Sequence, residues 1–199
     1  MRLEKLIEKF VDAEKINNEV VYNEFSLQHE LGIFLREEFK NSFRVKFERN
    51  VGCFSEKEDP DYLKKFVKKE IDIVICKGRR ENPEKYAIEL KYPTNGAYPQ
   101  SMFQCIKDIK FMEQVKDELG FINTYCLTLT SDSFKGKLFR SSNKNSEGIY
   151  SFFRNKKEIH GKIKNPQHNS GESYNITGEY SIDWRQIDDT TFWYYLLKI

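Results

Sequence analysis

Two short apolar segments that carry charges decide the fold of this sequence: EIDIVIC at residues 70–76 and YAIELK at residues 86–91. Both are rich in Ile, Val, Leu or Tyr and are bounded by polar residues, which is typical of buried strands. A buried charge is costly unless it is paired or bound to a metal. The charged residues Asp72, Glu89 and Lys91 therefore need partners or a ligand.

The register between the two segments follows from the loop that joins them, which contains Gly, Asn and Pro as turn residues. If Cys76 pairs with Lys85 in an antiparallel ladder, Asp72 lies directly opposite Glu89. Side chains alternate between the two faces of a strand, so Lys91 projects from the same face as Glu89. Two opposed carboxylates repel each other unless a cation lies between them, and oxygen ligands suit Mg²⁺ or Mn²⁺.

Length and composition predict one domain over residues 1–199, with a formal net charge of +2. An aromatic content of 15% argues against disorder. No secretory leader or apolar run of membrane-spanning length is recognised, and the cysteines are scattered without a C-x-x-C motif. We therefore expect a cytoplasmic protein with reduced thiols, no contact with a membrane and no structural zinc site.

The remaining pattern predicts an α/β fold in which helices flank a mixed central sheet. The segment 86–91, the helix that follows it and the strand after that helix form a crossover unit, so the two strands are expected to be parallel. The expected elements are helices at 2–16, 23–39 and 99–119, strands at 43–49 and 124–130, and a helical turn at 62–67.

The helix at 23–39 carries an acid, Glu30, beside its buried stripe. Glu30 either reaches solvent at the boundary of the stripe or leans over the sheet towards the metal. The neighbouring His29 points about 100° away and is expected at the surface.

The part of the chain after residue 131 is predicted to be an irregular, basic extension. Between residues 135 and 164 nine basic side chains face only two acidic ones. This segment is either a solvated loop region or a surface that contacts phosphates, with aromatic rings able to stack on bases. The tail adds strand-like runs at 174–184 and 192–197, the second as core or a dimer face. The candidate nucleic-acid contacts are Lys135, Lys137, Arg140, Lys156 and Lys157, together with Gln104 of the helix at 99–119.

An Asp on one strand and Glu-x-Lys on the next suit metal-dependent hydrolysis of phosphodiesters. The carboxylates hold the cation, which stabilises charge on the phosphate and lowers the pKa of a bound water. The lysine positions that water or neutralises the developing charge.

With the early helix and the crossover helix, these residues resemble the PD-(D/E)XK nuclease superfamily over residues 23–130. The resemblance implies a restriction-endonuclease-like fold and a Mg²⁺-dependent nuclease. Asp72 and Glu89 would be metal ligands, with the Leu90 carbonyl as a third, Lys91 would be the catalytic lysine, and Glu30 would match an acid that many members carry on the early helix.

Three further positions bear on the resemblance. Gln104 sits where RecB-like members have a glutamine. Ile71 replaces the nominal proline, which is a common substitution. Asp108 stands where the RecB-like subset has tyrosine, so no subset is assigned.

The sequence thus predicts a DNA endonuclease of restriction, defence or mobile-element type. Cutting both strands of a duplex would need two sites, which a homodimer would supply. A catalytically inactive nucleic-acid-binding or interaction module on the same fold is the alternative, and an enzyme acting on another phosphate ester is a third reading. A fourth is structural: Glu70 lies opposite Lys91 in the same register, and the two could form a buried ion pair.

Overall fold

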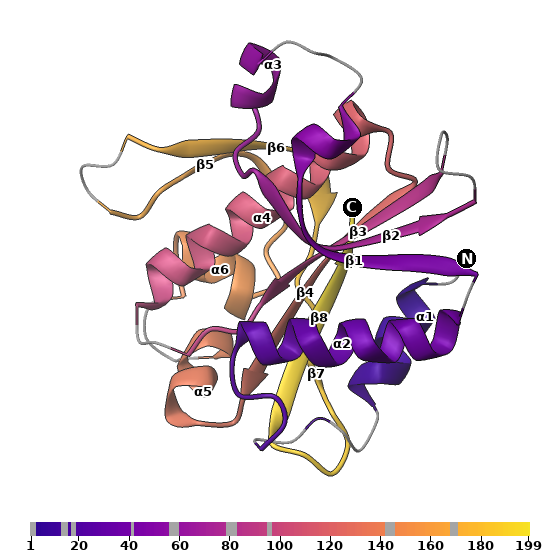
Figure 1. The fold of residues 1–199 in the computed structure, drawn as a ribbon. Coiled ribbons are helices and arrows are strands. Elements are labelled where there is room, and N and C mark those ends of the chain that lie inside the picture. The colour runs from indigo at the N-terminus through magenta and orange to yellow at the C-terminus, as the bar shows by residue number, and fades with distance from the viewer. Residues whose placement is uncertain are drawn as a thin grey trace.

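A six-stranded mixed sheet forms the centre of the protein, with strand order β1-β2-β3-β4-β8-β7 (Figure 1). The computed structural model describes residues 3–12, 16, 19–40, 42–55, 60–78, 83–94, 97–141, 146–167 and 171–199. The strands of this sheet are β1 (Phe43–Asn50), β2 (Glu70–Lys77), β3 (Glu84–Lys91), β4 (Asn123–Ser131), β7 (Arg185–Gln186) and β8 (Phe192–Lys198). The α/β class and the mixed sheet are confirmed.

Helices cover both faces of the sheet. They are α1 (Leu3–Val11), α2 (Glu24–Phe39), α3 (Pro60–Lys64), α4 (Tyr98–Leu119), α5 (Phe134–Arg140) and α6 (Ile149–Arg154), with a 3₁₀ turn, η1, at Val51–Phe54. A separate hairpin pairs β5 (Ile159–Lys164) with β6 (Ser173–Tyr180). None of the helices in the described residues is both long and apolar enough to cross a bilayer.

The register predicted for the central pair is confirmed. β2 and β3 are antiparallel with Cys76 opposite Lys85. β3 and β4 are parallel and are joined by α4, as the crossover argument requires. This arrangement sets Glu89 beside Cys126 and Lys91 beside Thr128.

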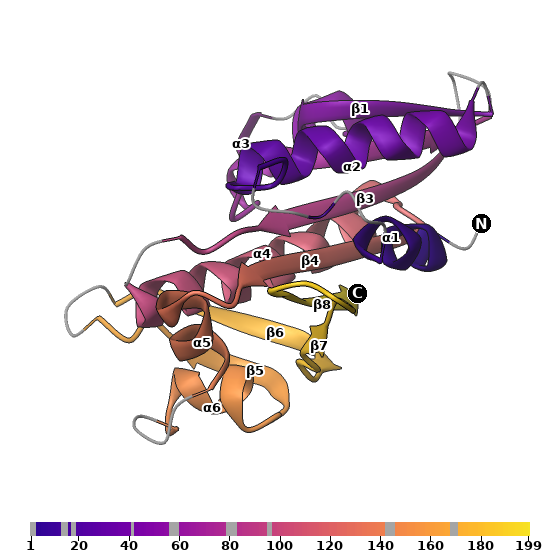
Figure 2. The same cartoon turned by 90° about the horizontal axis from the view of Figure 1, so that it is seen from below.

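Each face of the sheet has its own apolar core. On one face α1 and α2 pack against Ile73 and Ile75 of β2. On the other face α4, α6 and the β5–β6 hairpin pack around Val74 and Ala87, and Figure 2 shows these C-terminal elements gathered on the side of the sheet away from α2. The predicted site residues Asp72, Glu89 and Lys91 belong to the α4 face by the alternation of the strands.

Local sequence explains why α2 and α4 begin and end where they do. Asn23 caps α2 by accepting a hydrogen bond from the Ser26 N–H at 2.8 Å. Gly32 lets α2 approach β1 closely, because a Cβ at this position would lie 2.1 Å from the Phe47 ring. Pro99 stands in the first turn of α4, and Gly120 ends the helix with a left-handed φ of 65°.

The expectation of an irregular region after residue 131 is wrong. Residues 134–140 and 149–154 are helical, and the hairpin follows them. The run at 192–197 is core, because β8 pairs with β4 inside the main sheet. Aromatic residues spread among polar ones concealed this order, since each short element buries only one side against α4 or its neighbours.

Candidate active site

The candidate site lies where β2 and β3 separate. Their ladder of paired residues ends at Ile73 and Ile88. Beyond this point the Leu90 N–H donates to Asp72 Oδ2 at 2.7 Å. A side-chain carboxylate thus takes the place of a backbone acceptor, which fixes Asp72 next to Glu89 on the neighbouring strand.

Glu89 is the most deeply buried acid of the site, with 1% of its surface exposed. Burial raises the pKa of its carboxyl well above the ordinary value, and the nearby charge of Asp72 raises it further. Burial also raises the pKa of Asp72, although the hydrogen bond with Glu89 and the charge of Lys68 oppose the change. Both shifts favour the protonated form of this pair of carboxyls in the metal-free protein.

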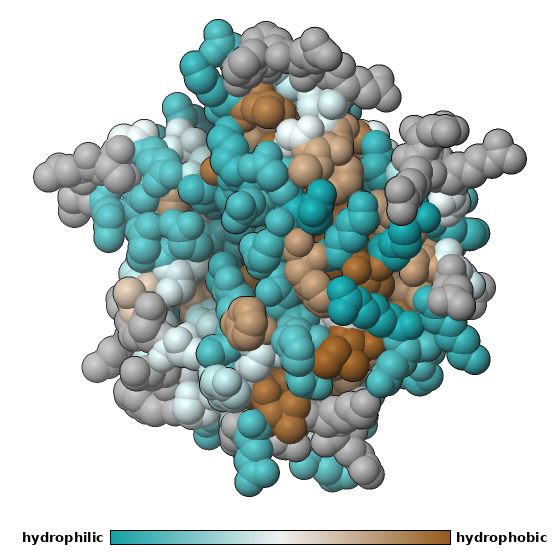
Figure 3. Space-filling view, viewed as in Figure 1, coloured by the Kyte–Doolittle hydropathy of each residue, from teal (hydrophilic) through white to brown (hydrophobic). Residues whose placement is uncertain are grey.

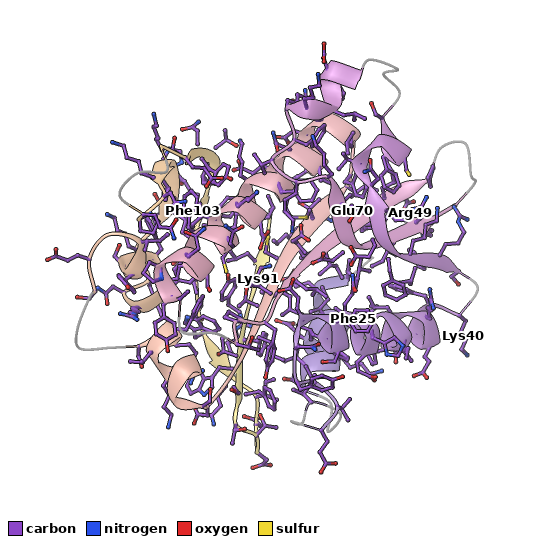
Figure 4. The ribbon with its side chains drawn as sticks, turned by 60° about the vertical axis from the view of Figure 1, so that its left-hand side comes forward. Phe25, Lys40, Arg49, Glu70, Lys91 and Phe103 are labelled. Carbon is purple, nitrogen blue, oxygen red and sulfur yellow. The ribbon has the colours of Figure 1, made fainter. Side chains whose placement is uncertain are left out.

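Two lysines contact Asp108 of α4, and one of them also contacts Glu89. Lys68 Nζ lies 2.8 Å from Glu89 Oε2 and 3.0 Å from Asp108 Oδ1. Lys91 Nζ lies 3.1 Å from Glu24 Oε2 and 3.6 Å from Asp108 Oδ2. Burial opposes the charge on both lysines, but attraction by Asp108 and the other carboxylates outweighs it and raises the pKa of each. Figure 4 shows Lys91 in the space between α4 and the end of α2 that carries Phe25.

The N-terminal end of α2 completes the site from the other side. Gln28 Nε2 donates to the Asp72 carbonyl at 2.9 Å and also to the carboxylate of Glu48. Glu48 has a φ of 45°, a left-handed conformation that costs on the order of 1 kcal/mol or more for a residue other than glycine. A cavity of about 240 Å³ opens between these residues, lined by Glu24, Phe25, Gln28, Glu48 and Asp72.

The structure brings Asp72, Glu89 and Lys91 together, but it leaves Glu30 and Glu70 apart from them. Glu30 lies 3.4 Å from His29 at the surface, and it is about 200° around the helix from Gln28. The acid of α2 that contacts Lys91 is Glu24 instead. Glu70 is exposed and pairs in register with Asn50 of β1, and Figure 4 shows it apart from Lys91, so the proposed Glu70–Lys91 ion pair is wrong.

The candidate phosphate contacts of the C-terminal part have acidic or aromatic partners. Arg140 is 8% exposed and donates to Asp132 at 2.6 Å, so it is a buried structural residue and the prediction of a phosphate contact is wrong. Lys137 lies 3.6 Å from the same Asp132. Lys156 pairs with Asp183.

Three other predicted contacts have different positions. Lys157 lies over the Phe152 ring, with its Nζ 5.6 Å from the ring centre. The side chain of Lys135 falls outside the described part of the chain. Gln104 is partly buried on α4, one turn before Asp108.

Sequence reasoning passed over several of the residues that complete the site. Asp108 gave a usable signal, because it interrupts the apolar stripe of α4 between Cys105 and Met112. Glu24 and Gln28 share one face of α2 by their i, i+4 spacing, which also could have been read. Lys68 lies in an irregular turn before β2, where no periodicity marks it.

The donor set fits a hard divalent cation such as Mg²⁺ in one respect. Within the described residues, both oxygens of Glu89 are buried without a hydrogen bond of standard geometry, and the ammonium of Lys68 is the cation in contact with them. Over that same part of the chain, no group of three or more His, Cys, Asp or Glu side chains is placed to hold a metal. Mg²⁺ is usually bound through one or two carboxylates plus waters and substrate phosphates, so Asp72 and Glu89 suffice as protein ligands. The predicted role of the Leu90 carbonyl stays a prediction.

Comparison with known proteins returned no match, whether against protein-family models, curated proteins or solved structures. The geometry of the site therefore carries the functional argument.

Proposed function

We propose that this protein is a metal-dependent nuclease that hydrolyses phosphodiester bonds, with Mg²⁺ or Mn²⁺ as cofactor and DNA as the first substrate to test. One observation carries the proposal. Asp72 and Glu89 meet on neighbouring strands, Glu89 is buried beside Asp72 with Lys68 as the cation in contact with it, and Lys91 follows on the same face. Two carboxyls held together in the core are costly, and a cation that needs oxygen ligands offsets this cost.

Each residue has a distinct task in the proposed reaction. Asp72 and Glu89 hold the cation, which when bound stabilises charge on the phosphate and lowers the pKa of a water. The Leu90 N–H keeps Asp72 in place. Lys91, held between Glu24 and Asp108, supplies a fixed positive charge at the reacting phosphate.

The test is cleavage of plasmid and single-stranded DNA with Mg²⁺ or Mn²⁺, comparing matched pairs of variants. Glu89→Gln and Lys91→Met each lower the cleavage rate by about 10²–10³-fold, the loss typical of removing one group that stabilises the transition state. Glu70→Gln and Lys77→Met change exposed residues of β2 with the same chemistry, so they retain the wild-type rate. Absence of cleavage and of metal binding in the wild type rules the proposal out.

A second candidate is an inactive nucleic-acid-binding module. Its supporting observation is the ammonium of Lys68, which lies between Glu89 and Asp108 and neutralises them without a metal. This candidate predicts binding that weakens steeply with salt and is unchanged in Glu89→Gln. The nuclease predicts binding that strengthens when Mg²⁺ is added, because the acidic site repels phosphates until a cation occupies it. Competition by other phosphate esters separates a nuclease from an enzyme of broader specificity.

A further inference from the structure

An exposed aromatic ring stands at the mouth of the candidate site. Phe25 is 72% exposed, and Tyr22 nearby is 60% exposed. Phe25 lines the same cavity as Asp72, so a ligand in this cavity lies beside both residues. In Figure 3 an apolar spot stands among hydrophilic residues over the N-terminal end of α2, which is the left end of the helix in Figure 1.

Local contacts at the start of α2 fix the backbone turn next to the ring. Ser26 Oγ accepts from the N–H groups of Tyr22 and Asn23 at 2.9 and 3.1 Å, which fixes the turn before α2. The Phe25 ring also lies nearly parallel to the His29 ring, at an interplanar angle of 13° and a centroid distance of 6.5 Å. An apolar ring that is mostly exposed to water is unfavourable for the free protein and favourable for binding a flat partner.

We propose that Phe25 stacks on an unpaired base of the substrate strand whose phosphate lies at Asp72 and Glu89. This assignment rests on the proposed nuclease function and names its substrate class: single-stranded or unpaired nucleic acid. A base inside a continuous duplex has both faces covered by its neighbours, so it offers no face to the ring. A single strand does, and stacking on an aromatic side chain contributes about 1–3 kcal/mol per base.

The charges around the Phe25 ring decide which part of the nucleotide enters the cavity. Glu24, Glu48 and Asp72 line the cavity and repel a phosphate, but a carboxylate accepts hydrogen bonds from the amino groups of bases. The Glu48 carboxylate accepts a hydrogen bond from Gln28, and both residues line this cavity. The cavity therefore receives the base, with an amino-bearing edge towards Glu48.

The experiment measures affinity for short oligonucleotides with Mg²⁺ in the Lys91→Met background, which keeps both metal-binding carboxylates and slows cleavage. Adding Phe25→Ala weakens binding of single-stranded DNA by about 5–100-fold, as the stacking energy predicts, and leaves duplex binding unchanged. Adding Phe25→Trp instead retains the affinity. The fluorescence that the new indole adds is quenched when single-stranded DNA binds. Oligo(dC) binds more tightly than oligo(dT), which lacks an amino group.

Each failure has its own meaning. Equal affinity of Phe25→Ala and the parent, or equal rescue by Phe25→Leu and Phe25→Trp, overturns the stacking role even when the protein cleaves DNA, and leaves Phe25 as a contact for a protein partner. Equal binding of oligo(dC) and oligo(dT) overturns the assignment of the base edge to Glu48. Absence of binding to any nucleic acid by any of these proteins removes the proposed function and this inference together.

Discussion

Two buried glutamates, one in the candidate site and one on α4, have opposite environments. Glu113 is 3% exposed and Glu89 is 1% exposed. Glu113 Oε1 accepts from the N–H groups of Thr177 and Gly178 at 2.8 and 2.7 Å and from the Tyr180 hydroxyl at 3.2 Å. Its other oxygen accepts from Lys110 at 3.0 Å. Glu89 has no backbone or hydroxyl donor of this kind among the described residues; it contacts Lys68 at 2.8 Å and faces another carboxyl.

The difference separates a structural charge from a functional one. Burial alone would raise the pKa of Glu113, but the bonds from Gly178 and Lys110 outweigh it and lower the pKa. The same burial raises the pKa of Glu89, and the charge of Asp72 raises it further, which together outweigh the opposing charge of Lys68. A carboxylate with four donors anchors the β5–β6 hairpin to α4, whereas one that faces another carboxyl is placed to take a ligand.

The largest effect on stability is expected from Glu113→Ala, which leaves the Thr177 and Gly178 N–H groups and the Tyr180 hydroxyl without an acceptor. We expect the free energy of unfolding to fall by about 3 kcal/mol, since each unsatisfied buried group costs roughly 1–3 kcal/mol. Urea unfolding measures this loss. Asp117→Ala, an exposed acid on the same helix, is the control and stays within about 0.5 kcal/mol of the wild type. A loss no greater than that of Asp117→Ala would mean that Glu113 does not hold the hairpin.

A smaller effect of opposite sign is expected from Glu89→Gln. The amide can donate to Asp72 and carries no charge, so the repulsion between two buried carboxyls is removed. In metal-free buffer the free energy of unfolding rises by about 1 kcal/mol, as is common when a costly functional group is replaced. Glu113→Gln, the same substitution at the other buried glutamate, lowers it. If Glu89→Gln destabilises the protein as much as Glu113→Gln does, Glu89 is a structural residue and the contrast between the two is lost.

The contrast also marks what the sequence could predict. The strand pattern and the turn residues predicted the pairing of Cys76 with Lys85, because a period of two fixes which side chains share a face. That register placed Asp72 beside Glu89. The helix that follows β3 was predicted for a similar reason, since its apolar residues recur with a helical period.

Contacts between distant elements could not be predicted in the same way. Asp108 and Lys68 reach the site through the packing of α4 and an irregular turn, which no local period encodes. Glu24 rather than Glu30 faces Lys91 because α2 crosses the sheet with its first turn over β3, and helical pattern alone does not fix that position. The basic count between 135 and 164 left out Asp132 and Asp183, which lie outside that window and pair with Arg140 and Lys156.

The smallest effects concern pH, where the two glutamates act in opposite directions. The folded pKa of Glu113 lies below its ordinary 4.5, so its contribution is present above pH 4.5 and is lost as the pH falls through the folded value. The folded pKa of Glu89 lies above its ordinary 4.5, so the folded state holds this proton more tightly. Stability therefore declines as the pH rises from 4.5 towards the folded pKa of the Glu89–Asp72 pair.

Each single proton contributes a slope of at most about 1.4 kcal/mol per pH unit, which urea unfolding between pH 3 and 8 in EDTA resolves. Glu113→Gln reduces the dependence of the free energy of unfolding on pH below pH 4.5. Above pH 4.5 the stability of this variant still declines as the pH rises. Glu89→Gln reduces the dependence of the free energy of unfolding on pH above pH 4.5 and leaves the dependence below pH 4.5 unchanged. Adding Mg²⁺ to the wild type should also reduce the dependence above pH 4.5, because a cation that binds the two carboxylates replaces the proton that the pair holds. If the slope above pH 4.5 is kept in Glu89→Gln, the proton belongs to other groups and the pair at the centre of the proposed site is not coupled.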